Sequence, residues 1–235
     1  MRFIIAIAFL IICNTFYAQN KVLIFHETEG YRHKSIEAGI QAIQRLGNEN
    51  DFNTIVSRDS RFFTENDLDD IDLVIFLNTT GDILNTDEEV AFQGYMDNGG
   101  NFFGIHAAAD TEYDWAWYGK LVGAYFKGHP KVQTAVVNVM MPDHMTVDHL
   151  PEQWKREDEW YNYKDIRPDL KVLMSLDEKT YEGGENGDNH PIAWFQNYTG
   201  GGRSVYTGGG HTVESYSDPD FLEHLRRCIR FALSD

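Results

Sequence analysis

Histidines and acidic residues occur together at three places that each follow an apolar run. His33 follows the run ending at Phe25, His106 directly follows Ile105, and His211 follows three glycines. An acidic residue lies within a few positions of each histidine. Imidazoles and carboxylates move protons near neutral pH, and they also bind divalent metals. The sequence therefore predicts one chemical site, provided that the fold brings the three segments together.

The segment from Gly104 to Ala108 has the Gly-x-nucleophile-x-small spacing of a sharp strand-to-helix turn. His106 occupies the position of the usual serine or cysteine, and imidazole is not a useful acyl nucleophile there. A rigidly held, exposed imidazole suits a general base or a metal ligand. The alternative is a histidine that is only hydrogen-bonded within a turn.

We predict His106 and His211 as catalytic imidazoles, with Asp110 and Glu159 as the carboxylates that transfer protons or bind sugar hydroxyls. His33, His106 and His211 are also the predicted ligands of a divalent, zinc-like ion with one position left open for water or substrate. Two alternatives remain open. Three imidazoles can share a polar cleft through hydrogen bonds without an ion, and Asp158-Glu159 can be a solvated pair.

These positions require a particular framework. Apolar runs without alternation predict buried strands at 21–25, 52–56, 71–77 and 101–106, and helical spacing predicts helices at 35–46, 87–96 and 219–233. Strands that alternate with helices indicate βαβ units, so we expect a single α/β domain with a mostly parallel central sheet and helices on both faces. Shorter strands, at 132–139, 172–174, 191–195 and 203–207, follow between glycine-rich loops.

Ligands of such folds bind at the carboxyl ends of the parallel strands. The strand ends at His26, Asn78, His106 and Thr207 should therefore line one rim of the sheet. Gly208-Gly209-Gly210 lacks the pattern of a phosphate-binding loop, so we expect no nucleotide cofactor.

Composition narrows the class of protein. The chain has 235 residues, of which 42% are hydrophobic, and this is enough apolar material for a sizeable core. Its formal net charge of −17 repels phosphate backbones and anionic lipid, which argues against nucleic acid as a partner. The composition does not predict the oligomeric state.

Residues 1–18 have the pattern of a secretory signal peptide: Arg2, an apolar run from Phe3 to Cys13, and a small residue at Ala18. We expect cleavage near Ala18, a mature domain over 19–235, and a periplasmic or extracellular protein without stable membrane insertion. Cys228 is then the one remaining cysteine, and its helical context predicts a buried thiol.

Several motifs resemble those of the ThuA-like proteins, a family named for trehalose utilisation. The matching segments, in order along the chain, are 30–36, 104–111, 117–124 with His129-Pro130, 158–161, 190–194 and 206–212. The resemblance implies a class I glutamine amidotransferase-like fold, which is a flavodoxin-like three-layer sandwich, here without the nucleophilic cysteine. It also implies a role in sugar metabolism, in particular with oxidised (3-keto) glycosides, and no glutamine amidotransferase activity.

Aromatic residues beside acids are a common way to hold a pyranose ring. We therefore predict a substrate-binding set that combines such aromatics with residues of the resembling motifs: His33, Trp115, Trp117, Tyr118, Trp160, His190 and Tyr206. For the aromatic members, packing in the core is the alternative.

Two function classes follow. The first is an exported enzyme that acts on a sugar or keto-sugar glycoside by histidine–carboxylate or metal-assisted hydrolysis, elimination or isomerisation. The second is a carbohydrate-binding module that kept the fold without catalysis.

Overall fold

The structure of the protein is a computed structural model that describes residues 19–65 and 68–234. The predicted signal segment, 1–18, lies outside the described residues. The helices are α1 (Ile36–Glu49), α2 (Phe62–Glu65), α3 (Thr86–Asp97), α4 (Ala116–Val122) and α5 (Pro219–Ala232). The strands are β1 (Asn20–Phe25), β2 (Phe52–Ser57), β3 (Leu73–Leu77), β4 (Asn101–Ile105), β5 (Tyr125–Gly128), β6 (Gln133–Val139), β7 (Gln153–Asp158), β8 (Asn162–Lys164), β9 (Lys171–Asp177), β10 (His190–Asn197) and β11 (Arg203–Thr207).

The main sheet of the described chain has nine strands in the order β2-β1-β3-β4-β11-β10-β9-β6-β7. The pairings from β2 to β11 are parallel, and those from β11 through β10, β9 and β6 to β7 are antiparallel. A separate antiparallel pair joins β5 to β8. The expected α/β fold with a mostly parallel core is confirmed, and the antiparallel half extends it.

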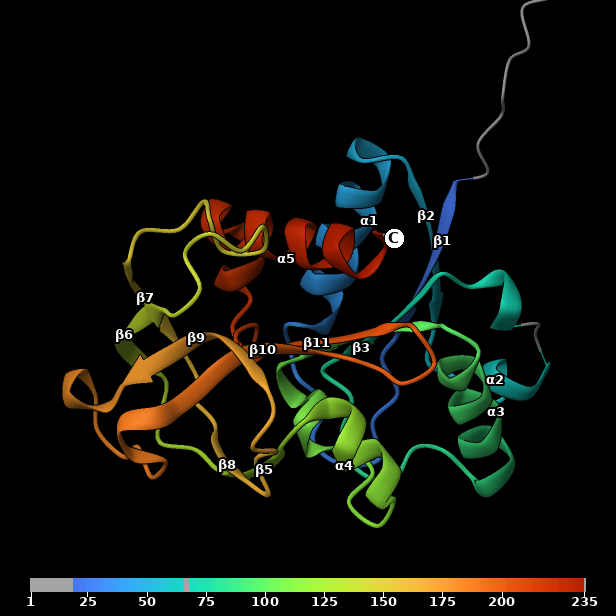
Figure 1. The fold of residues 1–235 in the computed structure, drawn as a ribbon, viewed down its shortest axis with the longest axis horizontal. Helices are drawn as coiled ribbons and strands as arrows, with labels where there is room; N and C mark the ends of the chain where they lie inside the picture. The colour runs from blue at the N-terminus through green and yellow to red at the C-terminus, as the bar shows by residue number, and fades with distance from the viewer. Residues whose placement is uncertain (1–18, 66–67, 235) are drawn as a thin grey trace, which may run out of the picture.

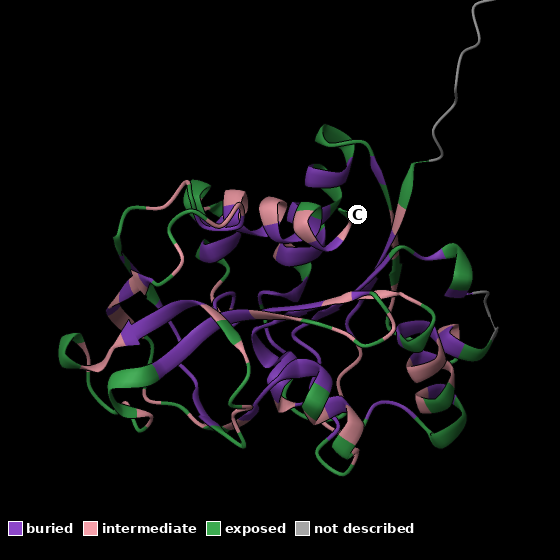
Figure 2. Ribbon diagram, in the orientation of Figure 1, coloured by how far each residue is buried: buried purple, intermediate pink, exposed green. Residues whose placement is uncertain are grey.

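Helices cover both faces of the sheet (Figure 1): α1 and α5 lie on one face, and α3 and α4 lie on the other. The central strands β3 and β4 are buried on both faces, which explains their continuous apolar sequence (Figure 2). Aromatic rings fill the layer beneath α3, where Phe76 stacks on Phe92 at 5.3 Å between ring centroids. No helix in the described part of the chain has the length and apolarity to cross a bilayer.

The ends of the helices differ by a few residues at most from those expected from the sequence. The helix expected to stop at Gly47 continues to Glu49, and Gly47 packs so closely on Phe52 that a Cβ atom would lie 2.7 Å from its carbonyl oxygen. Helix α3 begins at Thr86, one residue earlier than expected, because the side chain of Asn85 caps it in a capping box with Glu88. Asp218 caps α5 as its sequence indicates.

Candidate metal centre at the strand ends

The carboxyl ends of β1, β3, β4 and β11 are neighbours in the sheet, so the segments that follow them meet at one edge. The rings of His33, His106 and His211 lie 5.1–5.2 Å apart, centroid to centroid. Glu159, which directly follows β7, joins them. One nitrogen from each imidazole and one Glu159 oxygen all lie within 4.8 Å of one another.

His106 is held in an unusual backbone conformation directly after β4. Its φ angle is +49°, in the left-handed region that a non-glycine residue rarely adopts, and its ring is fully buried. Nδ1 lies 2.9 Å from the carbonyl oxygen of Gly208, so Nδ1 carries the proton and donates it to that carbonyl. Nε2 has no hydrogen-bond partner within the described ranges and therefore offers its lone pair to the site.

The other two imidazoles also bring buried ring nitrogens to the cluster. Nδ1 of His33 has no hydrogen-bond partner among the described residues, and Nδ1 of His211 faces the Glu159 carboxylate at 3.1 Å. Burial and the neighbouring imidazoles of His106 and His211 lower the pKa of His33 to about 3, so this ring is neutral. Burial lowers the pKa of His211, but Glu159 outweighs that effect and raises it overall.

Glu159 brings the negative charge. Its Oε2 atom lies 3.1 Å from Nδ1 of His211 and 3.5 Å from Nε2 of His106, and its Oε1 atom lies 3.0 Å from Nδ1 of His129. Burial raises the pKa of Glu159, yet His106 and His211 more than compensate and hold it below its usual range. This carboxyl group is therefore ionised.

Nδ1 of His33 and Nε2 of His106 are buried without a hydrogen-bond partner in the described chain, and such polar atoms cost free energy unless something binds them. A set of three nitrogens and one carboxylate oxygen is a donor set typical of zinc and similar divalent ions. The residues present therefore fit a divalent metal, and Glu159 adds a fourth candidate ligand to the three histidines expected from the sequence.

A polar and aromatic rim surrounds this cluster. The ring of Tyr161 lies 4.2 Å from that of His106, and the ring of Tyr31, which is 61% exposed, lies 4.9 Å from that of His33. The hydroxyl of Tyr113 donates to Oδ1 of Asp110 at 2.6 Å. Burial raises the pKa of Asp110, although the Tyr113 hydrogen bond opposes this shift.

The structure does not bring most of the predicted sugar-binding aromatics to this rim. Trp160, Tyr118 and Tyr206 are buried in the core. The Trp160 indole donates to the carbonyl of Gln133, and the Tyr118 hydroxyl donates to that of Ala108. These rings therefore pack the domain.

The remaining members of the predicted substrate set lie behind or beside the site. Trp115 and Trp117 stack on each other at 4.6 Å and contact Phe92 under α3. The buried ring of His190 bonds through Nε2 to the carbonyl of Tyr161. Tyr206 donates to the carbonyl of His106 at 2.7 Å, so it supports a cluster residue through the main chain.

His129 and Tyr161 were not predicted as site residues. His129 follows β5, a four-residue strand with no clear apolar signal, and Tyr161 is adjacent to the more conspicuous Trp160. Both residues lie in segments that carry the family resemblance, His129-Pro130 and 158–161, and this resemblance was the available signal.

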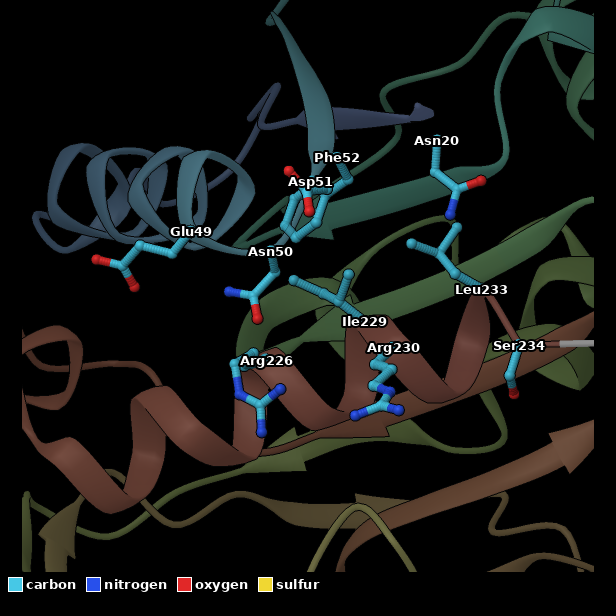
Figure 3. Close-up of a pocket in the computed structure, with 10 residues that line it drawn as sticks. All are labelled: Asn20, Glu49, Asn50, Asp51, Phe52, Arg226, Ile229, Arg230, Leu233 and Ser234. Carbon is cyan, nitrogen blue, oxygen red and sulfur yellow. The ribbon is translucent and has the colours of Figure 1, made fainter. Parts of the chain in front are cut away.

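A hollow of about 510 Å³ lies at the opposite edge of the sheet, where β1 and β2 begin (Figure 3). Asn20, Asn50, Phe52, Arg226, Arg230 and Leu233 are among its lining residues. The described side chains that line it include no histidine. Volume alone therefore does not identify the chemical site of this protein.

Comparison with solved structures supports this architecture. A ThuA-like protein from Bacteroides uniformis is 25% identical, with a TM-score of 0.77 over 93% of this chain and 94% of the other. A second, from Parabacteroides merdae, is 18% identical, with a TM-score of 0.75 over 92% and 91%. A protein from Thermoplasma acidophilum described as part of a GMP synthase shares the fold at 14% identity, with a TM-score of 0.53 over 92% and 96%.

A search of curated proteins finds no match. The family profile described as "ThuA: Trehalose utilisation" matches residues 21–232, and that description supports a role in carbohydrate metabolism. With this match spanning nearly the whole described chain, the protein belongs to the ThuA family of the glutamine amidotransferase-like superfamily.

Proposed function

We propose that this chain is a metal-dependent enzyme that acts on a sugar or keto-sugar glycoside. The observation that carries the proposal is the convergence of three imidazoles, those of His33, His106 and His211, on the ionised carboxylate of Glu159. An ion held by such a donor set can stabilise negative charge that develops on oxygen during a reaction.

His33, His106, His211 and Glu159 would hold the metal. When bound, a divalent ion polarises a carbonyl or hydroxyl oxygen and stabilises charge that develops on it. The protein fixes the ligands in advance: the Gly208 carbonyl sets the tautomer of His106, and burial keeps His33 neutral.

Asp110 is the proposed proton carrier. Its carboxyl group is bonded to the Tyr113 hydroxyl, and burial favours its protonated form, so it can exchange a proton with a substrate at the rim. The exposed rings of Tyr31 and Tyr113 offer apolar faces to a pyranose ring. These residues replace the core tryptophans in the substrate-binding role.

A keto-sugar suits this arrangement chemically. In a 3-keto glycoside, the hydrogen on C2 is acidic because it lies next to the carbonyl group. When a base removes that proton, the C1–C2 double bond forms, the bond from C1 to the glycosidic oxygen breaks, and the leaving alcohol takes up a proton. The reaction needs one base, one acid and stabilisation of the carbonyl oxygen.

The test combines metal analysis with an activity screen of the purified protein against 3-keto and ordinary disaccharides. We expect about one ion per chain and turnover of a keto-sugar substrate, with both lost in His106→Ala. His149→Ala is the matched control, since His149 lies outside the cluster and bonds to the carbonyl of Asp220. Sugar binding without a metal and without turnover would instead identify a carbohydrate-binding module.

We also propose that the protein is exported. The support is the signal-like sequence of residues 1–18. N-terminal sequencing of the protein recovered outside the cytoplasm should begin near Gln19. Recovery of the chain there with Met1 intact would contradict cleavage.

A further inference from the structure

We propose that Asp158 is the positioning residue of the metal centre: its buried carboxylate fixes Glu159 and His211 in the geometry in which they bind the ion. The inference rests on the proposed metal site. It concerns a residue that touches neither the ion nor a substrate.

The carboxylate of Asp158 is fully buried and accepts hydrogen bonds through both oxygens. Oδ1 accepts from the main-chain N–H groups of Glu159 at 2.9 Å and His211 at 3.1 Å. Oδ2 accepts from the N–H of Gly210 at 2.9 Å. One side chain therefore joins the end of β7 to the loop after β11, and each of these segments supplies a cluster residue.

A buried cation balances this charge. Arg156 donates from Nη2 to Oδ2 of Asp158 at 2.9 Å, and its guanidinium lies between the rings of Trp154 and Phe221, 4.6 and 4.4 Å from their centroids. Ser215 also donates to Oδ2 at 2.9 Å. Because the pair is neutral overall and enclosed on several sides, the carboxylate has no freedom to turn away from the loop.

The same loop is fixed from its carbonyl side. The carbonyl oxygen of Gly210 accepts from Ser35 Oγ at 3.0 Å and from Asn78 Nδ2 at 3.2 Å. Gly210 has a φ of +111°, and a Cβ atom there would lie 2.8 Å from the Tyr216 hydroxyl. The loop thus follows a path that only glycine permits, with Asp158 holding its N–H groups.

The loop after β11 also contacts a third proposed ligand, His106. Gly208, in the same loop, accepts from Nδ1 of His106 and so sets the tautomer of that imidazole. A shift of the loop would displace His211 and release His106. Partners of this kind affect metal affinity about 10–100-fold when they are removed.

The substitution Asp158→Asn tests the role without changing the size of the side chain. An amide has one oxygen, so its NH2 group must face either the two N–H groups at Oδ1 or the donors at Oδ2. In both orientations donors that held the site lose their acceptor. Arg156 also becomes an uncompensated buried cation, so a second variant, Arg156→Leu/Asp158→Asn, removes that charge.

The probe is Co²⁺, whose affinity and visible absorption report on its ligands. We expect Co²⁺ affinity to fall about 10–100-fold in both variants, with an altered absorption spectrum. Thermal stability should recover from the single to the double variant, while affinity should not. Glu88→Gln is the control, because this buried carboxylate caps α3 away from the site. The Co²⁺ affinity of this variant should equal that of the wild type.

Wild-type affinity and spectrum in Asp158→Asn would overturn the inference alone. Recovery of both Co²⁺ affinity and thermal stability in the double variant would also overturn it. The single variant would then act only through the unpaired buried charge of Arg156. A wild-type protein that binds no Co²⁺ would overturn the proposed metal site and this inference with it.

Discussion

The imidazole of His211 lies 3.1 Å from the Glu159 carboxylate, and the main-chain N–H of the same residue donates to Asp158 at 3.1 Å. Adjacent acids at the end of β7 therefore hold one histidine by its side chain and by its backbone. The first contact makes Glu159 a candidate ligand. The second contact fixes the backbone of His211. Because Asp158 also accepts from the N–H of Glu159, it keeps the two residues in a fixed relative position.

Replacing Glu159 by glutamine should weaken metal binding by at least about tenfold, the effect that the loss of a supporting partner alone can produce. The carboxylate is the one anion among the four donors, and an amide oxygen is a poor substitute for it. Competition with a coloured chelator measures the affinity. Glu152→Gln changes an exposed glutamate and should have no effect, and equal affinities in the two variants would remove Glu159 from the ligand set.

Tyr31→Ala should raise KM for the substrate with little change in thermal stability. The ring is 61% exposed and contacts His33 edge-on, so its removal exposes no core and should change stability by less than about 0.5 kcal/mol. Tyr31→Phe keeps the ring and should keep KM near that of the wild type. A normal KM in Tyr31→Ala would show that the sugar does not rest on this face.

Trp160→Ala should behave in the opposite way. This indole is buried and donates to the Gln133 carbonyl, so its loss leaves a cavity and should cost about 3–5 kcal/mol of unfolding free energy. Urea denaturation measures the change. A small loss of stability combined with a large rise in KM would instead return Trp160 to the substrate-binding role.

The parallel half of the sheet was predictable because each of its central strands is buried on both faces. A continuous apolar run such as Leu73–Leu77 can therefore be recognised as a strand from the sequence, without knowledge of the strands that pair with it. The same runs locate the strand ends, and so the approach of His106 to His211. The short strands β5 and β8 carry no comparable signal, and they form a separate two-stranded sheet.

Strand β7 escaped prediction for a different reason. Its inward positions are Trp154, Arg156 and Asp158, and two of these three are charged. A hydropathy pattern cannot recognise a core face built on a buried ion pair. The aromatics near Asp110 pose the converse problem: Tyr113 faces the rim and Trp117 faces the core, and the residue type does not distinguish these environments.

His224 should make stability depend on pH. Its fully buried ring bonds to the carbonyl of Thr146 and the hydroxyl of Thr207, and the basic side chains of His149 and Arg156 lie nearby. Burial lowers the pKa of His224 from its ordinary value of 6.5 to about 4. Between pH 6.5 and pH 4, the unfolded chain therefore binds a proton on this imidazole that the folded chain does not bind. The contribution of the neutral His224 ring to the free energy of unfolding is fully present above pH 6.5.

As the pH falls from 6.5 to 4, this difference should remove up to about 3 kcal/mol of unfolding free energy. His224→Asn cannot titrate but can still donate to Thr146. It should be less stable at neutral pH and should lose less stability on acidification. Burial also lowers the pKa values of His26, His144 and His190, which act in the same direction in both proteins, so the quantity to compare is the difference between their denaturation curves. Parallel pH profiles for wild type and variant would mean that the pKa of His224 is the same in the folded and the unfolded chain.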